Sequence, residues 1–355
     1  MNIYGVILAG GGGTRFWPLS RKDLPKQFLN LTGTDLMVNE TIDRMSGVIE
    51  QGNIFIVTSK EQAELTYQAT EGRIEKDHIL LEPAARNTAA CIAYAAETIM
   101  KKYGDGVMCV LPSDHYIKDN DGFRKVMSRA IDTANETDAL ITVGIHPTFA
   151  ATGYGYIRYD KSFPGPVKEV AEFVEKPDIK TAKQYLQEGC YLWNSGMFFW
   201  KVGVILKQFQ TLLPDIYQKV EQIGDAINTP MEEAVLNEVY PVIPKISIDY
   251  GIMERADNVK VIAGEFGWND VGSWDALQAL YEEDANGNVI YGEQIHVDTH
   301  NCICYAKTKL IAALGVEDLI IVEADDAILV CHRDKAQEVR RVVEELKNNG
   351  KEHYL

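Results

Sequence analysis

The chain has 355 residues, of which 46% are hydrophobic and 25% are charged, a composition typical of a folded globular protein. Its formal net charge is −17, from 52 acidic and 35 basic residues, and this excess of acid argues against general binding to nucleic acids or anionic membranes. No apolar run approaches the ~20 residues of a membrane span, and the first apolar segment is too short for a signal peptide. The six cysteines are scattered and lack zinc-site spacing, so we expect reduced thiols and a cytoplasmic protein.

The first predicted element is a buried strand at residues 3–8 that ends in glycines, within the segment GVILAGGGGTRFWPLSRKDLPKQF. Without side chains, residues 10–13 allow backbone N–H groups to surround phosphate oxygens. The segment matches neither the Walker loop nor the dinucleotide loop G-x-G-x-x-G. A glycine turn without a ligand is the alternative, but Arg15 and Lys26 follow closely and favour a phosphate-binding loop.

The first 145 residues alternate between predicted strands and helices. Further strands are expected at 53–58, 107–111 and 139–144, and helices fall between them, including 88–102 and 123–137. This alternation predicts an α/β fold with a doubly wound, mainly parallel sheet. Ligands of such sheets bind at the carboxyl ends of the strands, which is where the glycine segment lies.

The chain becomes richer in β structure after residue 153. Aromatic and β-branched segments predict strands within 153–159, 167–177 and 191–200, with a short helix at 178–187. Three helices are then expected at 202–223, 232–239 and 249–257, before a strand at 259–263.

The pattern changes again after residue 284. Short, evenly spaced β segments predict a small β-helix or β-sheet, closed by an amphipathic helix at 335–347. We therefore expect two domains, 1–285 and 286–355. The second contains no polar cluster at a strand end, so it is expected to be architectural and to support a subunit interface.

Polar residues collect where four predicted apolar strands end. Asp114 lies in LPSDH, Glu175 and Lys176 in FVEKP, Asn194 in WNSGMFFW, and Asp270 in WNDVGSW. Each residue alone fits a local turn or cap, but together they indicate one site at the sheet edge. Glu175 and Lys176 can hold one ligand only if the chain bends near Pro177, since neighbouring side chains of a strand point to opposite faces.

The residue types indicate phosphate and metal chemistry. Two separated aspartates without a histidine or cysteine cluster suit Mg²⁺. Arg15 can bind a polyphosphate through its fork of donors, while Lys26 and Lys176 act as point charges. No serine–histidine or cysteine–histidine pair is present, and His115 is expected to pack in a turn rather than to act as an acid or base.

Eight segments, in this order, resemble the mannose-1-phosphate guanylyltransferases (GDP-mannose pyrophosphorylases) of the sugar-phosphate nucleotidyltransferase family. The segments are LAGGGGTRFWPLSRKDLPKQF, LEPAARNTAACIA, LPSDH, TGYGYI, FVEKP, WNSGMF, SIDYGIME and WNDVGSW. The resemblance implies a Rossmann-like nucleotidyltransferase domain followed by a short β-helix-like domain with a terminal helix. It also implies transfer of GMP from GTP to α-D-mannose 1-phosphate with Mg²⁺ as cofactor, by a cytoplasmic homodimer.

The same resemblance implies roles for individual residues. The nucleotide would be bound by Ala9, Gly10, Gly11, Gly13, Thr14, Arg15, Lys26, Asn87, Thr88, Ser113 and Asp114. The sugar phosphate would be bound by Gly155, Glu175, Lys176, Asn194 and Asp270. Asp114 and Asp270 would hold the metal, and these two residues with Arg15 and Lys26 would carry catalysis.

Three alternatives stay open at this point. A sister enzyme would use glucose 1-phosphate with UTP or dTTP and would differ only in how it reads the base and the sugar. A non-catalytic regulatory subunit would bind a nucleotide sugar without turnover, which the full set of charged residues disfavours. A kinase-like phosphate-binding protein is disfavoured by the missing Walker lysine.

Overall fold

The computed structural model describes residues 1–11, 14–162 and 164–355. These residues form two compact units, each built from several stretches of the chain. The sheet unit comprises Met1–Gly10, Thr41–Ser113 and Asp119–Phe266, and the tail unit comprises Gly11–Glu40, Asp114–Lys118 and Gly267–Leu355. Among the described helices, none combines the length and the apolar character needed to cross a membrane.

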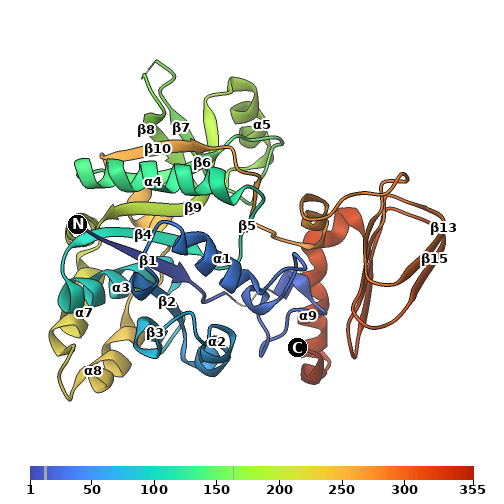
Figure 1. Cartoon of the computed structure of the whole chain (residues 1–355), viewed down its shortest axis with the longest axis horizontal. Coiled ribbons are helices and arrows are strands. Elements are labelled where there is room, and N and C mark those ends of the chain that lie inside the picture. Colours follow the sequence, from blue (N-terminus) through green and yellow to red (C-terminus); the bar gives the residue numbers. More distant parts are fainter. Residues whose placement is uncertain (12–13, 163) are drawn as a thin grey trace. The chain divides into compact units, whose positions relative to one another are not determined.

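The sheet unit is organised around one mixed sheet with the strand order β3-β2-β1-β4-β9-β6-β10-β8-β7 (Figure 1). Its strands are β1 Asn2–Leu8, β2 Ile54–Ser59, β3 Ile79–Glu82, β4 Gly106–Pro112, β6 Leu140–Ile145, β7 Tyr156–Tyr159, β8 Val167–Val174, β9 Tyr191–Lys201 and β10 Val259–Gly264. The predicted α/β class is confirmed, and β3, β2, β1 and β4 run parallel. Strand β9 is antiparallel to β4 and to β6, so the second half of the sheet is mixed.

Helices pack on both faces of this sheet. They are α1 Met37–Ser46 (which begins in the tail unit), α2 Ala63–Ala69, α3 Asn87–Tyr103, α4 Asn120–Glu136, α5 Ile179–Glu188, α6 Val202–Leu212, α7 Pro214–Ala226 and α8 Glu232–Val239. Tyr4 and Val6 of β1 belong to the core formed with α3, α6, α7 and α8. Helix α4 packs along β6, β9 and β10 (Figure 1). The sheet is thus covered on two sides, which explains why β1 is buried along most of its length.

Two predicted helices differ from those in the structure. The helix expected at 202–223 is two helices, because Pro214 begins α7 and cannot continue the helix before it. The helix expected at 249–257 is a single π-helical turn, Asp249–Met253.

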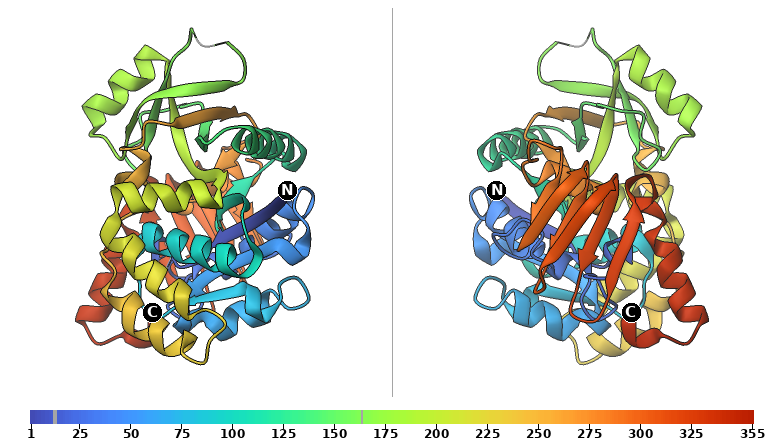
Figure 2. Two further views of the ribbon diagram at one scale, coloured as in Figure 1. Left: turned by 90° about the vertical axis from the view of Figure 1, so that its left-hand side faces the viewer. Right: turned by 90° about the vertical axis from the view of Figure 1, so that its right-hand side faces the viewer.

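The tail unit contains two small sheets and a helix. Strands β12 Val289–Tyr291, β14 Ile303–Ala306, β16 Leu319–Glu323 and β17 Ile328–His332 form one sheet, and β13 Gln294–His300 pairs with β15 Ile311–Glu317. These strands lie side by side in the right-hand view of Figure 2. Helix α9, Val339–Asn348, follows a 3-10 turn at Arg333–Glu338, so the predicted terminal helix is present in two parts.

The segment after the glycines packs with the C-terminal strands. Phe16 and Trp17 share one hydrophobic core with Trp274, Tyr305 and Val339. The compact units therefore do not coincide with the predicted boundary at residues 285/286, which stays a prediction.

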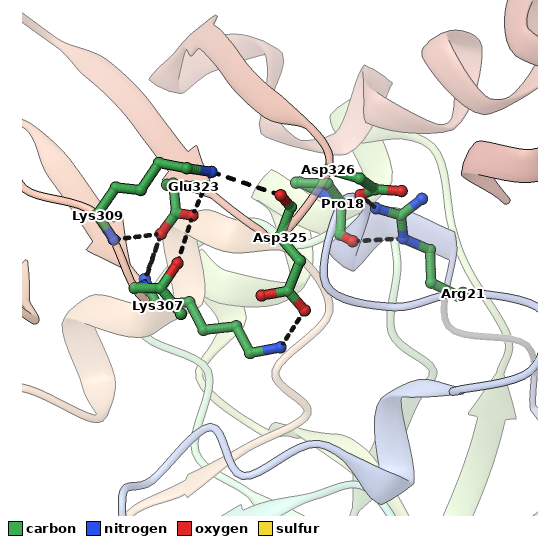
Figure 3. A network of polar contacts seen from close by, with 8 residues as sticks. Pro18, Arg21, Lys307, Lys309, Glu323, Asp325 and Asp326 are labelled. Atoms are coloured by element: carbon green, nitrogen blue, oxygen red, sulfur yellow. Dashed lines mark hydrogen bonds and ion pairs between the residues drawn. The ribbon is translucent and has the colours of Figure 1, made fainter.

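One buried carboxylate organises a turn in the tail unit. Glu323 at the end of β16 accepts hydrogen bonds from the backbone N–H groups of Lys307, Thr308 and Lys309, at 2.9, 2.8 and 3.2 Å. The ammonium of Lys309 also donates to Glu323, and Lys307 pairs with Asp325 (Figure 3). One carboxylate thus accepts from three successive backbone N–H groups of the turn between β14 and β15.

Candidate active site

A buried lysine joins two of the predicted aspartates within the tail unit. The Lys26 ammonium donates to Asp114 Oδ2 at 3.0 Å and to the backbone oxygen of Asp270 at 2.7 Å. Lys26 is only 4% exposed, and a buried ammonium needs such partners. Strands β5 Tyr116–Ile117 and β11 Trp268–Asn269 are antiparallel, so Asp114 and Asp270 lie at the same end of their ladder. We call Lys26, Asp114 and Asp270 the lysine cluster.

The lysine cluster offers charged oxygen ligands. Burial opposes ionisation of Asp114, but Lys26 and His115 hold the pKa of this carboxyl below its ordinary value. The absence of a side chain on Gly272 leaves room for the Asp270 carboxylate, whose oxygens would lie 3.0 and 3.3 Å from a Cβ at that position. Lys26 thus links the Asp114 carboxylate to the Asp270 backbone, and carboxylates are the oxygen ligands that a divalent cation such as Mg²⁺ prefers.

His115 packs against a neighbouring aromatic ring. Its ring lies edge-on to that of Trp268, and the indole N–H of Trp268 donates to His115 Nδ1 at 3.2 Å. This contact agrees with the expected packing role.

Arg15 contacts the C-terminal part of the chain. Its guanidinium donates to Gln337 Oε1 at 3.2 Å, and the Gln337 amide donates to Ser273 Oγ at 2.6 Å. The sequence predicted an architectural role for residues 286–355, and in the structure η9, Arg333–Glu338, packs beside the 3-10 turn Thr14–Phe16 and brings Gln337 to Arg15. Thr14 and Gly11 are exposed, whereas Gly13 lies outside the described residues.

Several predicted nucleotide contacts in the sheet unit also serve the fold. The Ala9 N–H donates to Val57 O at 2.8 Å, and the Ser113 N–H donates to Leu8 O at 3.1 Å, so both complete the sheet. Thr88 Oγ1 accepts from the Ile248 N–H at 2.9 Å. Asn87 is exposed at the start of α3.

The sequence did not point to Glu82 at the end of β3. It is buried, it accepts a hydrogen bond from the Tyr240 hydroxyl, and its Oε2 would lie 3.3 Å from a Cβ on Gly10. Burial raises the pKa of Glu82 to about 7. The sequence feature that could have indicated Glu82 is its place at the end of a short apolar run, directly before Pro83.

Four predicted sugar-phosphate residues come together in the sheet unit. The backbone oxygen of Gly155 accepts from the Asn194 N–H at 2.8 Å, and a Cβ on Gly155 would lie 2.4 Å from Glu175 Oε2. The Lys176 ammonium donates to Glu175 Oε1 at 2.6 Å. Lys176 has a φ of 50°, so the expected bend is present and turns both side chains toward one another.

A fifth residue, Asp249, completes what we call the Asn194 cluster. Asp249 Oδ1 accepts from Asn194 Nδ2 at 2.9 Å. Burial and the nearby Glu175 raise the pKa of Asp249 to about 7. Of the described predicted residues, the tail unit holds the lysine cluster and Gly11, Thr14 and Arg15. The sheet unit holds the Asn194 cluster, Ala9, Gly10, Ser113, and the start of α3 with Asn87 and Thr88. Asp270, also predicted to bind sugar phosphate, lies in the tail unit.

Comparison with known proteins identifies two matching families. The family profile described as "Nucleotidyl transferase" matches residues 4–287, and the profile described as "MannoseP isomerase/GMP-like beta-helix domain" matches residues 292–346. The chain is 38% identical to the mannose-1-phosphate guanylyltransferase of Escherichia coli strain K12, over 99% of this chain and 75% of the relative. The mannose-1-phosphate guanylyltransferase ManC of Salmonella typhimurium is also 38% identical, with the same coverage.

A solved structure is similar along almost the whole chain. It is described as a mannose-1-phosphate geranyltransferase from Thermus thermophilus, with a TM-score of 0.90 and 34% identity. The similarity covers 98% of this chain and 100% of that one.

Proposed function

Since the chain belongs to the nucleotidyl transferase family, we propose that it transfers GMP from GTP to α-D-mannose 1-phosphate, forming GDP-mannose and pyrophosphate. The observation that carries this function is the 38% identity to named mannose-1-phosphate guanylyltransferases over 99% of the chain. The charged clusters at the predicted positions support it.

For the nucleotide, we propose that Arg15 and Lys26 bind the phosphates and that the backbone of residues 9–11 and of Thr14 surrounds them. Gly13, predicted to share this role, lies outside the described residues. Ser113 and Asp114 border this site, and Asn87 and Thr88 help to hold the guanosine. We also propose that Glu82 recognises the guanine base, and its position beside Gly10 supports this role. A carboxylate oxygen accepts hydrogen bonds, and guanine presents an amino donor that adenine lacks at the same edge.

For the sugar phosphate, we propose that Lys176 binds the phosphate and that Glu175 and Asn194 bind hydroxyl groups. Because Gly155 has no side chain, the Glu175 carboxylate can lie against its backbone, and this contact supports the assignment of Gly155 to the pocket. We propose that Asp270 also binds the sugar phosphate, in addition to holding the metal ion.

Enzymes of this family generally use a divalent metal ion. We propose Mg²⁺, held by Asp114 and Asp270, because both offer oxygen ligands in the lysine cluster. When bound, the ion would offset phosphate charge and stabilise the charge that develops on pyrophosphate.

The transfer requires no general base from the protein. The second pKa of a phosphate monoester is near ~6, so mannose 1-phosphate is mostly a dianion at neutral pH. One of its phosphate oxygens forms the new bond to the α-phosphorus of GTP, while the bond from this phosphorus to the bridging oxygen breaks and pyrophosphate leaves. Lys26 and Arg15 place positive charge near the reacting phosphates, and Lys176 orients the attacking group.

The test measures pyrophosphate release from a panel of nucleotides and sugar 1-phosphates in the presence of Mg²⁺. We expect GTP with mannose 1-phosphate to give the highest kcat/KM. An equal or higher kcat/KM with UTP and glucose 1-phosphate would favour the sister enzyme instead, and binding without turnover would favour a regulatory subunit.

The metal assignment has its own test. Asp114→Ala should lose most turnover, by about 100-fold or more, because few oxygen ligands can replace it. The control is Asp43→Ala, an exposed residue paired with Arg73 on the surface. Near-normal turnover of Asp114→Ala at limiting Mg²⁺ would contradict the assignment.

We further propose a cytoplasmic homodimer. All cysteines of the described residues are free thiols, which supports a reducing compartment. Val297 and Leu314 are paired on β13 and β15 and are 52% and 72% exposed, which supports an interface on the tail. Sedimentation velocity of the full chain tests the assembly, and a monomer at micromolar concentration would contradict it.

A further inference from the structure

The segment SIDYGIME stood out in the sequence but received no role there. In the structure it contains the π-helical turn Asp249–Met253. π-helical turns are rare in proteins, and those that occur often lie at functional sites. The contacts made by the two ends of the turn give this segment a role.

The first contact fixes the side chain of Asn194. Its Oδ1 accepts from Thr142 Oγ1 at 3.1 Å and from the Gly196 N–H at 3.2 Å, and its Nδ2 donates to Asp249 at 2.9 Å. A carboxamide has two acceptor positions and two donor hydrogens. Both acceptor positions of Asn194 are therefore used, and one Nδ2 hydrogen has its direction set by Asp249. The second Nδ2 hydrogen is what Asn194 can offer a ligand.

The second contact fixes Glu175. Glu254, directly after the π-helical turn, accepts a hydrogen bond from the Glu175 backbone N–H at 3.0 Å. The bend at Lys176 follows immediately, where the backbone adopts a positive φ. One short segment thus holds Asn194 through Asp249 and the Glu175–Lys176 bend through Glu254.

We propose that Asp249 and Glu254 are positioning residues of the sugar-phosphate pocket: they orient Asn194 as a hydrogen-bond donor and hold Glu175 and Lys176 in their bent arrangement. This inference rests on the proposed function, because the pocket is defined by the acceptor substrate. Neither residue needs to contact the sugar itself.

The charge of the Asn194 cluster agrees with this role. Glu175 carries one carboxylate and Lys176 one ammonium, and Asp249 lies beside both. A second negative charge would repel a phosphate dianion. The raised pKa of Asp249, about 7, lets this side chain be neutral while it accepts from Asn194.

The experiment compares Asp249→Ala, Asp249→Asn and Glu254→Ala in the full chain. Asp249→Ala should raise the KM for mannose 1-phosphate about tenfold, the value of one hydrogen bond to a positioned group, and change the KM for GTP less than about twofold. Asp249→Asn should stay within about threefold of the wild type, because an amide oxygen still accepts from Asn194. Glu254→Ala should raise the same KM by about threefold or more.

The matched control is Asp105→Ala. Asp105 accepts from the backbone N–H groups of Gly106 and Gly203 at 2.9 and 3.0 Å, away from the Asn194 cluster. It should alter thermal stability and leave both KM values unchanged. If Asp249→Ala does not fold, Asp249→Asn and Glu254→Ala still decide the question by the ratio of the two KM values.

Two results would overturn the inference. The first is an equal rise of the KM values for mannose 1-phosphate and GTP in Asp249→Ala. The second is a rise of the KM for mannose 1-phosphate in Asp249→Asn that is as large as in Asp249→Ala. An unchanged KM in all three variants would also overturn it. These results reject the inference alone as long as the wild-type protein forms GDP-mannose. Absence of GDP-mannose from the wild type would instead reject the proposed function.

Discussion

Lys26 and Lys176 illustrate how two lysines with similar sequence settings differ in the structure. Each stands next to a proline, and both were expected to meet phosphate. The side chain of Lys26 is 5% exposed and pairs with Asp114, whereas that of Lys176 is 57% exposed and pairs with Glu175. Removal of either lysine would leave a carboxylate without its ammonium partner, and the Glu175 side chain is 9% exposed against 36% for Asp114. The two lysines differ instead in their own burial, because only Lys26 fills a buried position.

The two lysines should therefore differ in kinetics and in stability. Lys176→Ala should raise the KM for mannose 1-phosphate about tenfold or more and lower the melting temperature less than Lys26→Ala does, since the Lys176 side chain is 57% exposed and that of Lys26 is 5% exposed. Lys26→Ala should lower kcat and the melting temperature together. The measurements are steady-state kinetics with each substrate varied in turn and a thermal melt. Lys180→Ala, an exposed lysine of α5, serves as control, and a selective rise in the KM for GTP in Lys176→Ala would reverse the assignment.

Among the elements, the turn between β14 and β15 shows how a single acid can determine a local structure. Glu323 is 2% exposed and accepts from three successive backbone N–H groups (Figure 3). Burial opposes its ionisation, but these donors outweigh burial and lower its pKa to about 2. The turn is thus tied to a charged carboxylate.

This turn should make the tail unit sensitive to acid. A carboxyl whose pKa is lower in the folded state contributes stability above its unfolded value and loses it as the pH falls. For Glu323 the loss should occur between about pH 4.5 and 2, with an upper limit of about 3 kcal/mol. Denaturant unfolding from pH 7 to 2 should show Glu323→Gln less stable than the wild type at pH 7, with the difference shrinking toward pH 2. Exposed Glu317→Gln is the control, and a constant difference across this range would contradict the prediction.

For the whole molecule, the tail does more than the sequence indicated. Phe16, Trp17, Leu29 and Leu31 share a core with the C-terminal strands and α9. The indole N–H of Trp17 also donates to the backbone oxygen of Tyr354 at 2.8 Å. The segment that carries Arg15 and Lys26 is therefore built on residues from the far end of the chain.

Removal of residues 286–355 should consequently affect turnover as well as assembly. The truncated protein would lose the apolar partners of Phe16 and Trp17 and the Gln337 contact of Arg15. We expect kcat to fall by at least about tenfold, with lower solubility from the exposed core. Pyrophosphate release and size-exclusion chromatography check both effects. A soluble truncated protein with unchanged kcat would show that residues 11–40 keep their structure without the tail.

Features that depend on neighbouring residues could be predicted from the amino-acid sequence. The apolar runs of β1, β2 and β4, the glycines after β1, and the polar residues Asp114 and Glu175 just past strand ends are local patterns. Asn194, also expected at a strand end, lies inside β9 instead. Because carboxyl ends of parallel strands share an edge, such patterns predict both the α/β class and where ligands bind.

The distant residues that support the predicted ones became visible in the folded chain. Glu82 next to Gly10, Asp249 on Asn194, and Gln337 on Arg15 join positions 55 to 322 residues apart. No local pattern specifies these contacts, because they arise when separate elements pack together and bury polar groups that then need partners. The same packing joins residues 11–40 to the C-terminal strands, since Phe16 and Trp17 bury their side chains there.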